Sequence, residues 1–176
     1  MRTKSLVLGT LLGGLTAFVW SNISWELIGW HEKTLLAFQR DEEVAAAISS
    51  HTVEDGTYLL PYGTSQQAID RMQKGPIVFA AVRRGGFGSS ARVFLIEAAI
   101  LFAASFLLTW LLLQTSGLGY ARRVAFVAVV GLCAGVMVDL PNWNWWGFSG
   151  WFSAVNVADD ILTWLAAGLV IAKVAK

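Results

Sequence analysis

Four carboxylates interrupt apolar stretches of this sequence, and they are the residues best placed to do chemistry. They are Glu97, Asp139, Asp159 and Asp160. A carboxylate inside a membrane is costly, so it normally faces a helix-bundle interior, a cavity or a partner. At a rise of about 1.5 Å per helical residue, all four would lie in the outer part of the membrane. The spacing therefore predicts a polar layer at one depth.

The last apolar stretch carries a polar face beside these acids. Its members are Ser153, Asn156, Asp160 and Thr163. Their spacing of three, four and three residues places them on one side of a helix, and Asp159 points away from it. We therefore expect a pocket that opens outward and is lined by Asp160, Asn156 and Asp139. Glu97 could join this pocket.

Three interpretations of the acidic residues remain open. They could hydrogen-bond other helices and fix the packing, or bind a proton or cation on a transport path. Together with His31, and with Glu32 beside it, they could instead hold a metal. Oxygen ligands would suit magnesium, calcium or manganese, and an added imidazole would suit zinc or iron. No H-x-x-x-H or E-x-x-H spacing supports the metal, so its identity and any cofactor stay unknown.

Tryptophans gather at the same level as the acids. Residues 141–152, which join the last two apolar stretches, contain Trp143, Trp145, Trp146 and Trp151. Tryptophan rings favour the headgroup region of a membrane, so we expect this loop to anchor at the interface and to contact lipid. The alternative is an aromatic cradle for a lipid headgroup, a quinone or a cation.

Four apolar segments must position these side chains. They are residues 5–25, 93–114, 124–140 and 153–172. Each approaches the roughly 20 residues that cross about 30 Å of hydrocarbon. The chain is 56% hydrophobic and 14% charged, whereas a soluble domain is about one quarter charged. These features predict an all-α membrane protein with a four-helix transmembrane bundle.

The first segment follows Arg2 and Lys4 and has no small-x-small cleavage site, so we expect an uncleaved signal anchor. Basic residues also flank the other segments on the same side, at Arg122, Arg123, Lys173 and Lys176. Because Lys and Arg accumulate on the cytoplasmic side, both termini are predicted to be cytoplasmic.

Pairs of glycines spaced by four residues predict close helix contacts, because small residues let helices approach in lipid. These pairs are Gly9 with Gly13 and Gly131 with Gly135. We expect them to pack helices within this chain rather than to form a dimer seam.

Residues 31–92 are too polar to span a membrane, so we expect them to form an insertion. It separates residues 1–30, which hold the first apolar segment and its outer flank, from residues 93–176, which hold the other three segments. Asp41 is expected to cap a helix, and Ser65 to cap another over residues 66–73. Strands are expected over residues 56–61 and 76–82. This small extracytoplasmic α/β domain has too little core to be stable alone, so we expect it to lean on the membrane helices or on a partner.

Composition excludes several classes of function. The net charge of +1 gives no surface for nucleic acid, and the single cysteine, Cys133, allows no disulfide within one chain. No nucleophile–base pair or cofactor fingerprint appears. We therefore expect a non-enzymatic accessory or interaction subunit that binds partner membrane proteins or copies of itself. The alternatives are a proton- or cation-coupled carrier, which would need a homo-oligomer, and a membrane metalloenzyme.

Three stretches carry a resemblance to a known family. They are residues 23–35 (ISWELIGWHEKTL), 110–118 (WLLLQTSGL) and 140–148 (LPNWNWWGF). They resemble a family of small, uncharacterised four-span proteins of the bacterial inner membrane, which has no known activity. The resemblance implies a bacterial source and a periplasmic insertion, and it adds no mechanism.

Overall fold

The computed structural model describes residues 2–115 and 117–175, and most of them are helical. In chain order the elements are α1 (Arg2–Asn22), the π-helical turn η1 (Ile23–Ile28), the 3-10 turn η2 (Glu32–Thr34), α2 (Asp41–His51), β1 (Gly56–Leu60), α3 (Gln66–Lys74), β2 (Val78–Val82), α4 (Ser90–Gln114), α5 (Tyr120–Trp146) and α6 (Gly150–Val174). Four of the described helices are long and apolar enough to cross a membrane: α1 with η1, α4, α5 and α6. The four predicted apolar helices and the small sheet are thus confirmed.

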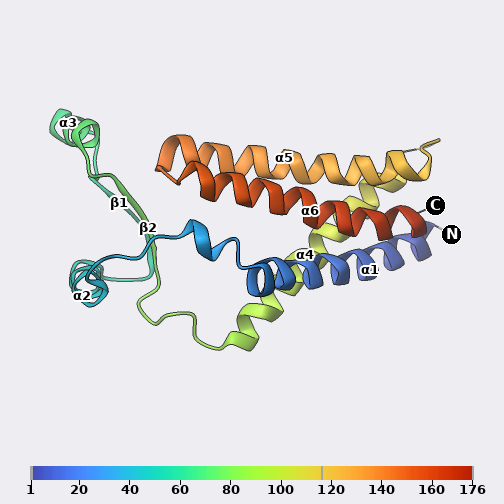
Figure 1. Ribbon diagram of the computed structural model, residues 1–176, viewed down its shortest axis with the longest axis horizontal. Coiled ribbons are helices and arrows are strands. Elements are labelled where there is room, and N and C mark those ends of the chain that lie inside the picture. Colours follow the sequence, from blue (N-terminus) through green and yellow to red (C-terminus); the bar gives the residue numbers. More distant parts are fainter. Residues whose placement is uncertain (1, 116, 176) are drawn as a thin grey trace.

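The four long helices lie alongside one another, and the insertion that contains the sheet lies beyond one end of them (Figure 1). The start of α1 and the end of α6 lie at the opposite end. We call these the insertion end and the terminal end. Helix α6 packs on both α5 and α1, and α1 packs on α4, whereas α4 makes few contacts with α5 or α6. The predicted bundle is therefore an open row of helices, in the order α5, α6, α1, α4.

Helices α5 and α6 approach through the second glycine pair. A Cβ atom on Gly131 would lie 2.7 Å from the Asp160 carbonyl oxygen, and one on Gly135 would lie 3.0 Å from the Cα atom of Val157. The first distance is shorter than a real side chain tolerates and the second is at that limit. Glycine at these two positions therefore allows the two backbones to come this close.

Helices α1 and α4 use the first pair in the same way. A Cβ atom on Gly9 or Gly13 would overlap the side chains of Thr109 and Ser105, respectively. The Ser105 hydroxyl also donates a hydrogen bond to the Gly9 carbonyl over 3.1 Å. Both glycine pairs therefore pack helices within the chain, as the sequence predicts.

The connection between α5 and α6 differs from the loop that the sequence predicts over residues 141–152. Helix α5 continues through Pro141 to Trp146, and α6 starts at Gly150. The sequence predicts the helix end at the proline, because proline lacks the N–H that would continue the helical backbone hydrogen bonds. The actual stop is Gly147, which has a φ of 74° and whose N–H binds the Asn142 carbonyl. Glycine reaches this left-handed conformation without the steric penalty of a side chain.

The insertion has the predicted order of helix, strand, helix and strand. Strands β1 and β2 are antiparallel, with Gly56 opposite Val82. Ser65 caps α3 as predicted, because its side chain accepts a hydrogen bond from the Ala68 N–H. Asp41 is not the cap of α2 as expected; Arg40 holds that position, and Asp41 is the first helical residue.

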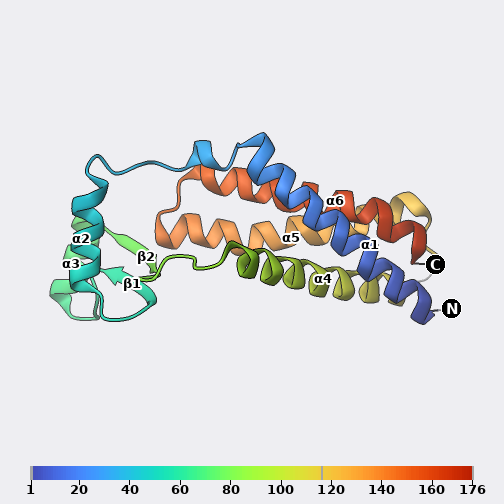
Figure 2. The same ribbon diagram turned by 90° about the horizontal axis from the view of Figure 1, so that it is seen from below.

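The insertion has almost no core of its own. Among residues 35–89, all of which the structure describes, only Pro61 and Ala68 are buried. Figure 2 shows α2, α3 and the two strands standing apart from the long helices, to which extended segments connect them. One aromatic contact bridges the gap: the rings of Phe79 on β2 and Trp146 on α5 stack with centroids 4.5 Å apart.

Candidate functional site

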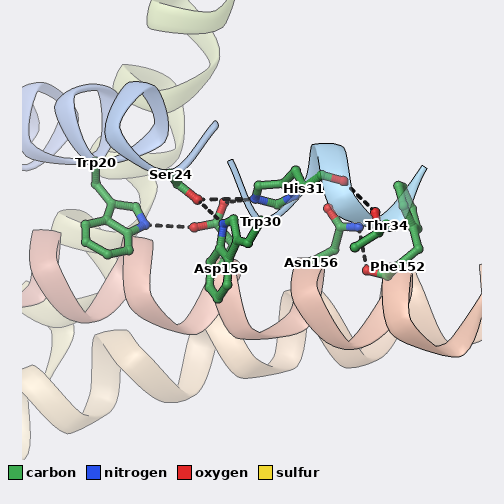
Figure 3. A network of polar contacts seen from close by, with 8 residues as sticks. All are labelled: Trp20, Ser24, Trp30, His31, Thr34, Phe152, Asn156 and Asp159. Atoms are coloured by element: carbon green, nitrogen blue, oxygen red, sulfur yellow. Dashed lines mark hydrogen bonds and ion pairs between the residues drawn. The ribbon is translucent and has the colours of Figure 1, made fainter. Parts of the chain in front are cut away.

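A buried polar network at the insertion end joins the segment after α1 to α6 (Figure 3). At its centre is His31, which is 1% exposed, and next to it are Asp159, 8% exposed, and Ser24, 0% exposed. His31 Nε2 lies 3.1 Å from Asp159 Oδ2 and 3.2 Å from Ser24 Oγ. The network thus connects residues 128 positions apart in the chain.

Two local features bring His31 to this place. Helix α1 widens into the π-helical turn η1, and such turns are frequent at functional sites. The chain then reverses at Gly29, whose φ of 63° favours glycine. Beyond it, the Thr34 N–H and hydroxyl both donate to the His31 carbonyl, over 3.0 and 2.7 Å. The 3-10 turn η2 that results packs against α6.

Tryptophans complete the network. Trp20 Nε1 donates to Asp159 Oδ1 over 2.8 Å, so both carboxylate oxygens have partners. Trp30 Nε1 donates to Ser24 Oγ over 2.7 Å. The Trp25 ring stacks on the imidazole with centroids 4.0 Å apart and planes 4° apart. Because a buried carboxylate is stable only when its oxygens are hydrogen-bonded, these contacts explain how Asp159 is accommodated.

The chemistry of His31 is set by the hydrogen-bond directions. An ionised carboxylate can only accept, so Nε2 carries a hydrogen and donates to Asp159. Nδ1 is then the nitrogen that faces no partner among the described residues, although it is buried. A carboxylate-oriented imidazole is the arrangement used by general bases and by metal-binding histidines.

Two observations describe the surroundings of His31. His31 is enclosed, with Trp25 stacked on its face and the Trp30 ring edge-on at 5.6 Å. In the described part of the chain, no three His, Cys, Asp or Glu side chains gather closely enough to hold a metal. The network holds the segment between α1 and the insertion against α6.

Of the predicted pocket residues, Asp160 and Asp139 lie close enough to interact electrostatically, and the others lie on different surfaces. Asp159 faces α1 and His31, whereas Asp160 faces α5, where a Cβ atom on Gly135 would lie 3.2 Å from its Oδ2 atom. Asp139 is one helical turn beyond Gly135 on α5. Asn156 lies on the side of α6 that carries Asp159, as Figure 3 shows, and donates to the Phe152 carbonyl over 2.8 Å. Two sequence neighbours, Asp159 and Asp160, therefore serve different helix contacts.

Glu97 and Glu32 lie elsewhere. Glu97 lines a cavity between α4 and the end of α1, together with Asn22 and Trp25. Glu32 is exposed on η2 and has no role in the network. The structure therefore does not bring Glu97 into the same pocket as Asp160 and Asp139.

The tryptophan side chains of residues 141–152 are largely exposed. Their exposed fractions are 53% for Trp143, 74% for Trp145, 39% for Trp146 and 63% for Trp151. Only Trp146 has a ring partner, Phe79, among the described residues. They form an aromatic surface around the insertion end of α5 and α6, as an interfacial anchor would require.

Sequence reasoning missed Ser24, Trp20, Trp25 and Trp30 as site residues. A signal for two of them exists: Trp20 near the end of α1 and Ser24 in η1 are four residues apart, and helical side chains at that spacing are neighbours. His31 reaches this network because the chain reverses at Gly29, and no periodic pattern in the sequence predicts that reversal.

Comparisons of the chain with protein-family models, with curated proteins and with solved structures find no match.

Proposed function

We propose that this chain is a multi-pass protein of a bacterial inner membrane, with both termini in the cytoplasm and the insertion outside. Four apolar helices of sufficient length support the placement. The orientation is supported by the clustering of basic residues at the terminal end, since Lys and Arg accumulate on the cytoplasmic side. Those residues are Arg2, Lys4, Arg122, Arg123 and Lys173.

Within that membrane, the chain acts as a non-enzymatic interaction subunit. The observation that carries this proposal is the insertion, which exposes large apolar side chains and buries almost none. The most exposed are Leu36 at 95%, Tyr62 at 87%, Val53 at 84%, Phe87 at 76% and Phe38 at 66%. Outside the membrane these groups would face water, and exposed apolar surface of this kind is typical of a protein-binding site.

The proposed partner is the extracytoplasmic part of another membrane protein. The buried His31–Asp159 pair supports this role, because it fixes where the chain leaves α1 for the insertion. The Phe79–Trp146 stack holds the other side of the insertion against α5. With these two attachments, the insertion presents its apolar side chains at a defined height above the membrane.

The two alternatives have less support. A carrier would use Asp160, Asp139 and Glu97 along one path, yet Glu97 lines a separate cavity between α4 and the end of α1. A metalloenzyme needs a set of ligands, and none gathers among the described residues. A purified, partner-free protein that moved an ion or turned over a substrate would reverse this ranking.

Co-purification from native membranes tests the interaction. The C-terminus is tagged, the protein is extracted in mild detergent, and the copurifying chains are quantified. We expect one defined membrane protein at a fixed ratio, and we expect Leu36→Ser combined with Phe38→Ser to lose it. The matched control is Leu169→Ser, which alters an exposed residue of α6 far from the insertion. Recovery of a lone chain, or of a homo-oligomer that the insertion variant leaves intact, would contradict the proposal.

A further inference from the structure

A cavity of about 640 Å³ lies at the insertion end, between the end of α1 and the start of α4. Helix α4 buries none of its residues before Leu101, so its first turns leave this space unfilled. The cavity lies beside the His31–Asp159 network and shares Trp25 with it. Its volume lies in the range of pockets that hold a drug-sized organic molecule.

Both charged side chains in the lining of this cavity are carboxylates. Glu26 comes from η1 and Glu97, which is half-buried, comes from α4. Among the residues that the structure describes, the ion pairs are His31–Asp159 and Arg40–Glu43, so neither glutamate has a basic partner there. The cavity therefore carries negative charge that no side chain of its lining neutralises.

Two arginines border a neighbouring cavity that also reaches Glu97, but they do not pair with it. Asp55, Arg83 and Arg92 all line that second cavity. Arg92 lies five residues before Glu97 on α4, whereas helical side chains meet at spacings of three or four. The Arg83 guanidinium lies over the Phe87 ring, 5.4 Å from its centroid. Glu97 is thus left without a cation from the described part of the chain.

Aromatic side chains form much of the remaining wall. Trp25, Phe87 and Phe94 line the cavity, and Trp25 and Phe94 are 47% and 46% exposed. Aromatic rings bury the apolar part of a ligand, and their faces attract cations. A wall of this kind beside two unpaired carboxylates suits a ligand that is both apolar and positively charged.

We propose that this cavity binds one organic cation with an apolar body, such as a hydrophobic quaternary ammonium or phosphonium ion. Its charge is attracted by Glu26 and Glu97, and its apolar groups pack on the aromatic wall. A magnesium or calcium ion takes about six or more oxygen ligands, which two carboxylates do not supply, and it would leave the aromatic wall unused. An anionic ligand would add a negative charge beside the two carboxylates. The site is separate from the proposed protein interaction, because Leu36 and Phe38 do not line the cavity.

Tetraphenylphosphonium and tetraphenylborate test the charge requirement, because the two ions have nearly the same size and shape but opposite charge. The full chain in phosphatidylcholine nanodiscs is dialysed to equilibrium against each ion, and empty nanodiscs measure the ion that dissolves in lipid. We expect tetraphenylphosphonium to bind saturably at one ion per chain. We expect no saturable binding of tetraphenylborate.

Two variants assign the charge preference to the cavity. Glu97→Gln and Glu26→Gln should each weaken tetraphenylphosphonium binding about tenfold, because each removes one attractive charge. The double variant should abolish saturable binding. The charge-matched control is Glu32→Gln, which changes an exposed glutamate of η2 at the same end of the molecule but outside the lining, and it should leave binding unchanged. An unchanged thermal unfolding midpoint shows that each variant is folded.

Three results would overturn the proposal. Saturable binding of tetraphenylborate with similar affinity would show that apolar contact alone holds the ion. Equal weakening by Glu32→Gln would show that the general surface charge attracts it. Displacement of tetraphenylphosphonium by micromolar magnesium would assign the carboxylates to an inorganic ion. The variant that combines Leu36→Ser with Phe38→Ser should retain tetraphenylphosphonium binding, so failure of the protein interaction and failure of the cation site are distinguishable.

Discussion

The long helices and the insertion are held together in different ways. The helices bury a shared cluster that includes Ala17, Leu108, Val127 and Ile171, and glycines bring their backbones close. In the insertion, residues 35–89 bury only Pro61 and Ala68. The helices are therefore organised by contacts within the chain, whereas the insertion depends on its attachments and, as we propose, on a partner.

The two contacts that attach the insertion to the long helices also differ in how well they are packed. The His31–Asp159 pair is buried, both Asp159 carboxylate oxygens are hydrogen-bonded, and the pair connects the insertion to the well-packed α1–α6 interface. The Phe79–Trp146 stack joins a half-buried strand residue to an exposed tryptophan. We therefore expect the first attachment to be strong and the second to open readily.

Removing the Asp159 carboxylate should have the largest effect. Asp159→Ala removes the acceptor of Trp20 Nε1 and the carboxylate partner of His31 Nε2, which should cost about 3 to 5 kcal/mol. The measurement is thermal or denaturant unfolding in detergent. Asp160→Ala is the matched control, because this half-buried carboxylate lacks such partners, and we expect a change below about 1 kcal/mol. Equal losses in the two variants would refute the assignment of Asp159 as the attachment.

Substitution at the α5–α6 contact should cause the next largest loss of stability. Gly131→Ala places a Cβ atom against the Asp160 carbonyl and should destabilise the helices by about 1 to 3 kcal/mol, the usual cost of overpacking. Gly85→Ala is the control, since a Cβ atom there would meet nothing within 4 Å. If the glycine pair formed a dimer seam instead, Gly131→Ala would change the oligomeric state before the stability.

Loss of the N-terminal cap of α3 should lower the stability of the insertion only. Ser65→Ala removes the acceptor of the Ala68 N–H and should destabilise α3 by about 1 kcal/mol. Because the insertion has little core, we expect faster amide hydrogen exchange in α3 and β1 and unchanged exchange in α5 and α6. Faster exchange in all four elements would indicate that the insertion and the helices form one cooperative unit.

The smallest effect on stability should come from the exposed apolar residues. Leu36→Ser alters a side chain that is 95% exposed, so the free energy of unfolding should change by at most about 0.5 kcal/mol. The same variant should reduce partner recovery. A large stability loss without a change in partner recovery would show that Leu36 is structural.

The parts of the fold that depend on local pattern could be predicted from the sequence. The apolar runs indicated the four long helices, and Ser65 with the glycine after Lys74 indicated the limits of α3. The continuation of α5 through Pro141 was not predictable in this way, because the ladder tolerates a missing N–H near its end and the decisive stop is Gly147.

The candidate site was predicted only in part. Asp159 and His31 were both identified as candidates, but their pairing depends on the π-helical turn and on the reversal at Gly29. These features bring His31 to the side of α6 that carries Asp159 rather than Asp160. Helical spacing alone correctly separated the two carboxylates onto different faces, yet it could not say which face met a histidine.

The most direct test of the interaction is site-specific photo-crosslinking in native membranes. A photoreactive phenylalanine analogue replaces Leu36 or Tyr62 on the insertion, and Leu169 on α6 as the control. We predict one crosslinked product of defined mass from the insertion positions and none from Leu169. Crosslinks only to lipid, or only between copies of this chain, would contradict the claim that the insertion binds another membrane protein.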